Sequence, residues 1–129
     1  MKSFTLFLFI IAIAAISACK KSNLTPGNAT LPGNWKVTGN WISSGGPMYF
    51  VPSTKNDHVQ FNANGTMSGS AFPDFKLYTF KDSVTIKMTS ADRTRYEDYI
   101  YKIKDDTLTL GLAGPTICIE GCAVELVKD

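Results

Sequence analysis

Apolar and polar residues alternate along much of the chain after residue 33, and this period of two restricts the possible folds more than any other feature. Near the start of this region, Trp35, Val37 and Trp41 alternate with polar residues. Because successive side chains of a strand point to opposite faces, the pattern predicts half-buried β-strands. Similar segments follow at residues 58–61, 66–68, 84–89, 99–104, 107–110 and 124–126. No segment has the period of an amphipathic helix.

Turn residues separate these segments. Asn64-Gly65 and Asp105-Asp106 each stand between two of the predicted strands, and the chain holds ten Gly and six Pro. We therefore expect about eight short strands connected as an antiparallel meander. Such a sheet must bury one face and avoid free edges, and an up-and-down barrel does both by closing on itself. The predicted fold is a small all-β antiparallel barrel over residues 33–129.

The first eighteen residues are expected to form an export signal. Lys2 precedes an uninterrupted apolar run at residues 6–16, which is long enough for the central region of a signal peptide and too short to span a bilayer comfortably. Residues 19–32 are rich in Pro, Gly, Asn and Thr and have no hydrophobic period. We expect this second segment to be a flexible tether that reaches about 20 Å.

Residues 16–19, Ile-Ser-Ala-Cys, resemble the lipobox of bacterial lipoproteins. The resemblance implies that the Cys19 sulfur receives diacylglycerol and that Cys19 becomes the first residue of the mature protein. Two or three acyl chains hold a protein stably on a membrane, whereas one holds it only marginally. The residue after the cysteine is Lys20 and not the Asp that retains lipoproteins at the inner membrane of enteric bacteria, so the resemblance implies an outer-membrane lipoprotein, on the periplasmic face or at the cell surface. An ordinary small-residue cleavage site is the alternative.

The charges of the chain argue against a nucleic-acid partner. The whole chain has a net charge of +2, but residues 33–129 hold 10 basic and 11 acidic residues. A near-neutral domain without a stripe of Lys and Arg is a poor nucleic-acid binder. Lys20 and Lys21 stand beside the predicted anchor and are expected to contact lipid head groups. No feature of the sequence identifies a protein partner.

Gly33-Asn34-Trp35 resembles the Gly-x-Trp motif that begins the first strand of lipocalins. Residues 107–110 and 118–124 are similar to the end of small lipocalin-like lipoproteins of Bacteroidota, so the resemblance spans most of the domain. It implies that Gly33 and Trp35 plug one end of the barrel and that the other end binds a small apolar or amphipathic molecule. Lipocalins usually carry an Arg over the plug Trp in the last strand. This chain has Glu125 there, and Lys128 is the candidate substitute.

A binding site at the open end is expected to use aromatic side chains. Trp41 shares the face of Trp35 in a regular strand and lies about 20 Å further along it, which places it near the opposite end of the barrel. The predicted ligand-binding residues are Trp41, Phe61, Met88, Tyr99 and Tyr101. The alternative is that all five belong to the core, and this alternative suits Phe61 and Met88 best. Trp41 is the strongest candidate because packing at a barrel rim is less complete.

Cys118 and Cys122 are expected to form a disulfide. They enclose three residues, and a three-residue hairpin with Gly121 in the left-handed position would place the two cysteines opposite each other. An exported chain meets an oxidising compartment, which favours the bond. Two reduced thiols packed in the protein are the alternative. A redox motif would need Cys-x-x-Cys, and a zinc site would need more ligands than one histidine supplies.

The sequence predicts neither an enzyme nor a cofactor. His58 lies on the opposite face of its predicted strand from Val59 and Phe61, so we interpret it as a solvated strand residue and not as a general base. No phosphate loop, serine elbow or metal cluster is present in the sequence. Two functions remain. The first is a binding module for a small apolar or amphipathic molecule. The second is a structural or protein-interaction lipoprotein whose barrel is filled with side chains, as small barrels commonly are.

Overall fold

The structure is a computed structural model that describes residues 31–119 and 121–129. The predicted signal peptide, the lipidation site at Cys19 and most of the predicted tether lie outside the described residues. The described part consists of nine strands joined by turns and loops: β1 (Gly33–Ile42), β2 (Tyr49–Pro52), β3 (His58–Phe61), β4 (Met67–Gly69), β5 (Leu77–Phe80), β6 (Thr85–Thr89), β7 (Tyr96–Lys104), β8 (Thr107–Gly114) and β9 (Ala123–Lys128). Across these residues, no helix has the length and apolar character needed to cross a membrane.

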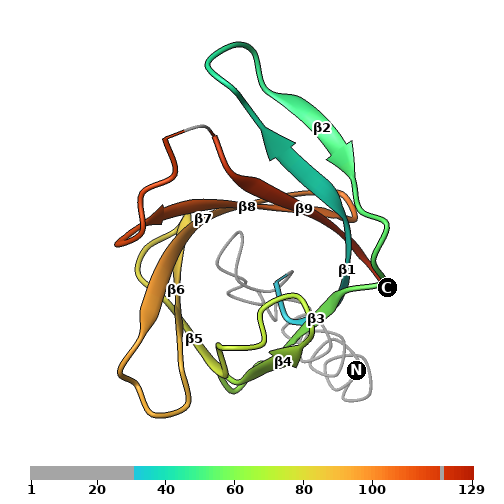
Figure 1. The fold of residues 1–129 in the computed structure, drawn as a ribbon. Helices are drawn as coiled ribbons and strands as arrows, with labels where there is room; N and C mark the ends of the chain where they lie inside the picture. Colours follow the sequence, from blue (N-terminus) through green and yellow to red (C-terminus); the bar gives the residue numbers. More distant parts are fainter. Residues whose placement is uncertain (1–30, 120) are drawn as a thin grey trace, which may run out of the picture.

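All nine strands belong to one antiparallel sheet, and eight of them follow one another in an order that curves round into a nearly closed barrel (Figure 1). The order of neighbours is β4-β3-β1-β9-β8-β7-β6-β5, and every pair is antiparallel. The first and last strands of this order meet where the Met67 N–H donates to Lys76 O and the Tyr78 N–H donates to Gly65 O, both at 2.8 Å. The predicted antiparallel up-and-down barrel of about eight strands is therefore confirmed.

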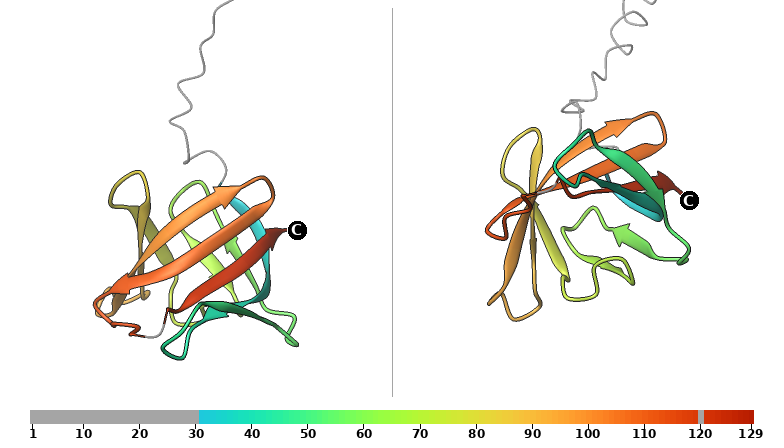
Figure 2. Two further views of the ribbon diagram at one scale, coloured as in Figure 1. Left: turned by 90° about the horizontal axis from the view of Figure 1, so that it is seen from above. Right: turned by 45° about the horizontal axis from the view of Figure 1, so that its top comes forward.

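The remaining strand, β2, pairs only with β1. It extends the barrel wall on that one side. The first half of β1 pairs with β3, with Trp35 opposite Val59, and the second half pairs with β2, with Trp41 opposite Phe50. The hairpin of β1 and β2 consequently projects beyond the rest of the sheet (Figure 1). It lies at the opposite end of the barrel from the start of β1 (Figure 2).

The strand residues that alternate inward fill most of the barrel. Strand β3 shows the pattern clearly, because His58 and Gln60 are exposed while Val59 and Phe61 are buried. The buried apolar side chains of the described part are Leu31, Trp35, Val37, Val59, Phe61, Met67, Tyr78, Ile86, Met88, Tyr101, Leu108, Leu110 and Leu126. Their burial supplies the main stabilisation of the fold, since the free energy gained on folding rises with the apolar area removed from water.

A β-bulge in β1 reverses the inward and outward alternation halfway along the strand. Val37 lies opposite Leu126 and Gly39 lies opposite Glu125, so Thr38 is an extra residue with no partner of its own in β9. After this bulge, Asn40 lies opposite Val124 on the inner face of the sheet, where it is exposed at the open end of the barrel, whereas Trp41 faces outward. The prediction that Trp41 shares the face of Trp35 is therefore wrong, because it assumed an unbroken strand.

Candidate functional site

The end of the barrel where β1 begins is closed by side chains. Trp35 is fully buried, and its Nε1 donates a hydrogen bond of 2.8 Å to the carbonyl oxygen of Leu31. Lys128 Nζ lies 5.2 Å from the centre of the Trp35 ring, which is a cation–π distance. Lys128, and not Glu125, therefore occupies the position above this Trp.

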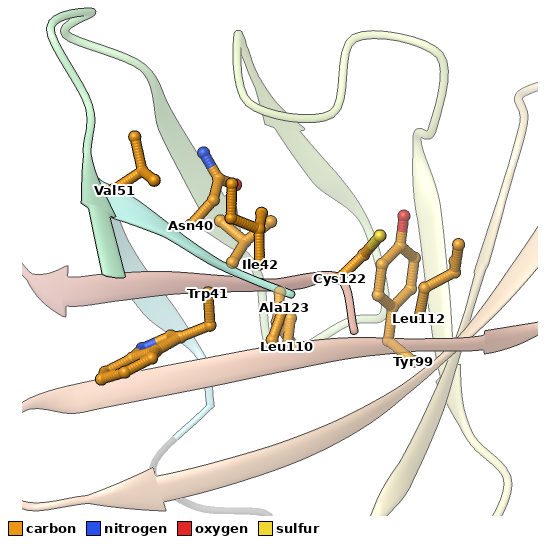
Figure 3. Close-up of a pocket in the computed structure, with 10 residues that line it drawn as sticks. Asn40, Trp41, Ile42, Val51, Tyr99, Leu110, Leu112, Cys122 and Ala123 are labelled. Carbon is orange, nitrogen blue, oxygen red and sulfur yellow. The ribbon is translucent and has the colours of Figure 1, made fainter. Parts of the chain in front are cut away.

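The opposite end of the barrel contains an apolar cleft of about 350 Å³. Its walls come from both halves of the β1–β2 hairpin and from β7, β8 and β9 (Figure 3). The lining residues are Asn40, Trp41, Ile42, Val51, Tyr99, Leu110, Leu112, Cys122, Ala123 and Val124. None of these residues is charged, so the apolar cleft suits an uncharged apolar group.

Tyr99 supplies a hydroxyl group to the wall of the apolar cleft. Burial, and then the negative charge of Glu97, raise the pKa of Tyr99 above its ordinary value. The phenol is therefore neutral at physiological pH and is able both to donate and to accept a hydrogen bond. The ring of Tyr99 also packs edge-on against Phe72, with 5.6 Å between the ring centres.

A second cleft of about 350 Å³, which we call the polar cleft, adjoins the apolar cleft. The two clefts share Asn40 and Val124 as lining residues. The polar cleft is otherwise formed by the chain that connects β2 to β3, by one residue of β1 and by the loop after β4. These further lining residues are Val37, Pro52, Ser53, Thr54, Lys55, Asp57, Ala71 and Phe72.

The connection between β8 and β9 lies beside the apolar cleft. Cys118 and Cys122 are at disulfide-bonding distance, with their Cα atoms 5.9 Å apart, and Gly121 has the expected left-handed conformation with φ of 61°. The loop is longer than the predicted three-residue hairpin, because β8 already ends at Gly114. Cys122 lines the apolar cleft directly, so the cysteine pair fixes part of its wall.

The structure brings only some of the predicted ligand-binding residues to the cleft. Tyr99 lines it, but Phe61, Met88 and Tyr101 are 1%, 0% and 5% exposed and belong to the core. Their predicted position at the open end is wrong: Phe61 is the last residue of β3 and lies opposite Gly33 at the closed end, and all three side chains pack in the hydrophobic core. The alternative that placed Phe61 and Met88 in the core describes them correctly.

Trp41 borders the apolar cleft, but its indole lies on the other side of the sheet. Nε1 donates a hydrogen bond of 2.9 Å to Glu125 Oε2, and the ring centre lies 5.3 Å from that of Phe50. In Figure 3 the indole points away from the side chains of Asn40 and Ile42. A ligand in the apolar cleft would therefore contact the neighbours of Trp41 and not the face of its ring.

The sequence analysis did not identify Asn40, Lys55 or Asp57 as candidate site residues. A regular strand would place Asn40 outside the barrel, and only the bulge at Thr38 turns it inward. The one available signal was Gly39, since a glycine inside a strand pattern often marks a bulge or a close approach of two backbones. A Cβ atom on Gly39 would lie 2.4 Å from the carbonyl oxygen of Val51.

Comparisons with known proteins give no assignment for this site. No protein-family model matches the chain, and no curated protein matches its sequence. Within residues 31–119 and 121–129, no group of three or more His, Cys, Asp or Glu side chains is placed to hold a metal ion.

Proposed function

We propose that this protein is a lipid-anchored, lipocalin-like lipoprotein of the outer membrane that binds a small apolar or amphipathic molecule in the apolar cleft. The observation that supports binding most strongly is the chemistry of that cleft. Its walls are aliphatic apart from Asn40, Tyr99, Trp41 and Cys122. Its volume of about 350 Å³ is at the lower end of the range for small-molecule sites, about 300–1,000 Å³.

The filled core sets how deeply a ligand enters. Leu110 lines the inner part of the apolar cleft, and beyond it Leu108, Leu126 and Trp35 are fully buried. A ligand would therefore occupy the open end of the barrel and not its whole length. This limits the ligand to a short apolar group, such as a medium-length alkyl chain or a small ring system.

The predicted anchor would be joined to the domain at the end opposite the binding site. The lipobox-like residues 16–19 predict lipidation at Cys19, and the first described residues lie at the closed end of the barrel (Figure 2). A membrane-held Cys19 would therefore leave the apolar cleft accessible at the other end of the domain. Replacement of Cys19 by Ser is expected to move the protein from the detergent phase to the aqueous phase in a phase-separation assay.

Binding can be tested with 1-N-phenylnaphthylamine (NPN), a neutral apolar dye whose fluorescence rises in apolar surroundings. Residues 20–129 are the suitable protein, since they retain all nine strands and the whole described core. We expect saturable NPN binding. Val51→Trp should abolish it by filling the cleft, whereas Val84→Trp should not, because Val84 is 52% exposed and lies outside both clefts. Equal NPN binding by both variants would contradict the proposed site.

A structural or protein-interaction role is the second candidate, and one observation favours it. Ile117 and Ile119 are 82% and 92% exposed in the loop between β8 and β9. Exposed aliphatic side chains that cluster on one loop are typical of a surface that another protein covers. This role would be preferred if the parent protein bound no NPN.

A further inference from the structure

We infer that the polar cleft is the head-group subsite for a single-chain amphiphile whose polar head carries no net charge. This inference rests on the proposed function and specifies its ligand class. The tail of such a molecule would lie in the apolar cleft, and its head would lie among the side chains of the polar cleft.

The two clefts are adjacent. Asn40 and Val124 line both of them. In addition, Phe72 of the polar cleft packs against Tyr99 of the apolar cleft, with 5.6 Å between the ring centres. A molecule that bridges the clefts would pass between these two pairs, and the Asn40 amide would meet it where the tail joins the head.

The loop that carries the polar side chains is held in place by hydrogen bonds to β1. The Ser53 N–H donates to Thr38 O at 2.8 Å, and the Val37 N–H donates to Asp57 O at 2.9 Å. Within the loop, the Lys55 N–H donates to Ser53 Oγ at 3.2 Å. Residues 53–57 are thus positioned by the bulged strand before any ligand binds, which lowers the cost of ordering them on binding.

The charges in the polar cleft balance. Lys55 supplies one positive charge and Asp57 one negative charge, and neither side chain forms an ion pair with another residue that the structure describes. Ser53, Thr54 and Asn40 add neutral hydrogen-bonding groups. A head with a net charge would be attracted by one of these two charged groups and repelled by the other. A zwitterionic or hydroxyl-rich head would interact favourably with both Lys55 and Asp57.

Four decyl compounds with different heads test this inference by displacing NPN from residues 20–129, below their micelle-forming concentrations. They are decyl glucoside with a hydroxyl-rich head, decylphosphocholine with a zwitterionic head, decanoate with an anionic head and decyltrimethylammonium with a cationic head. We expect either decyl glucoside or decylphosphocholine to displace NPN at about three- to tenfold lower concentration than decanoate and decyltrimethylammonium. Whichever of the two displaces NPN at the lower concentration shows whether the subsite prefers a hydroxyl-rich or a zwitterionic head.

Single substitutions should change this preference in opposite directions. Asp57→Asn leaves Lys55 unopposed and should strengthen decanoate binding about three- to tenfold relative to decyltrimethylammonium, while Lys55→Gln should do the reverse. Lys102→Gln and Asp105→Asn are matched controls, because they make the same changes in net charge outside both clefts. Neither control should alter the preference.

The experiment distinguishes failure of the head-group subsite from failure of the proposed binding function. Equal competition by all four compounds, or equal effects of the Lys55 and Asp57 variants and their controls, would overturn the head-group subsite while NPN binding still supported the apolar cleft. Failure of NPN and of every decyl compound to bind would overturn the proposed function, and with it this inference.

Discussion

Trp41 Nε1 donates a hydrogen bond of 2.9 Å to the Glu125 carboxylate on the outer face of the barrel. The hydroxyl of Thr38, the extra residue of the bulge, lies 3.1 Å from the other carboxylate oxygen. Glu125 therefore ties together the two residues whose positions depend most on the bulge. The same reversal that sends Trp41 outward turns Asn40 toward the two clefts.

Trp41 is expected to contribute to stability and not to binding. Trp41→Phe removes the bond to Glu125 and should lower the free energy of unfolding by about 1 kcal/mol, a common value for one hydrogen bond. Its NPN affinity should stay within about twofold of the parent value, because the indole faces away from the apolar cleft. Urea unfolding and an NPN titration of the same sample measure the two effects. Loss of NPN binding would show that the indole lies inside the site.

Trp35 is expected to be essential for stability. Trp35→Ala removes a fully buried side chain and should lower the free energy of unfolding by about 3–5 kcal/mol. Lys128→Met should cost less, about 0.5–1 kcal/mol for the lost contact of the ammonium group with the ring, because it leaves the buried Trp35 side chain in place. Denaturant unfolding followed by circular dichroism checks both values. A Trp35→Ala protein as stable as the parent would contradict the closed end.

Gly39 is expected to tolerate no side chain. A Cβ atom there would lie 2.4 Å from Val51 O and 2.5 Å from the Phe50 ring, so Gly39→Ala forces β1 and β2 apart. We expect a loss of at least about 1–3 kcal/mol, as for other overpacked sites. Gly111→Ala is the control, since its nearest contact would be at 3.9 Å. Equal thermal stability of the two variants would show that the close approach of β1 and β2 is not maintained.

Asp92 is expected to make the stability of the domain depend on pH in the acid range. The Ser90 hydroxyl and the Thr94 N–H donate hydrogen bonds to its carboxylate and lower its pKa from 3.8 to about 2. Because the folded-state pKa is depressed, the ionised carboxylate stabilises the folded state above pH 4 and loses this effect as the pH falls toward 2. The stability advantage of the parent over Asp92→Asn should therefore shrink between pH 4 and pH 2 in urea unfolding. A difference that is constant over this range would refute the prediction.

Most of the strands could be predicted from the sequence, and two of the short ones could not. Residues 99–104 of strand β7 alternate regularly, and the inward side of Tyr99, Tyr101 and Ile103 followed directly. Strands β3 and β4 are short but are joined by a turn at Asn64-Gly65, whereas β2 and β5 have four residues each without a clear period of two. Their pairing depends on neighbours that are distant in the sequence, such as β1 for β2 and β6 for β5.

The candidate site was harder to predict than the fold because it combines residues from separate strands and a loop. Asn40, Tyr99 and Val124 come together only when β1, β9, β8 and β7 pair in one curved sheet, and one bulge decides which of Asn40 and Trp41 faces the clefts. Tyr99 could be named in advance from its aromatic side chain and its face. Lys55 and Asp57 could not, since charged loop residues are common on any surface.

The central claim is that a small apolar molecule binds in the apolar cleft, and methyl NMR spectra recorded during an NPN titration test it most directly. We expect the methyl resonances of Ile42, Val51, Leu112 and Val124 to shift with saturation, because these side chains line the cleft. The resonances of Leu108, Leu126 and Ile86 should stay in place, because these side chains are fully buried outside it. Shifts confined to Ile117 and Ile119, or no shifts at all, would contradict the account.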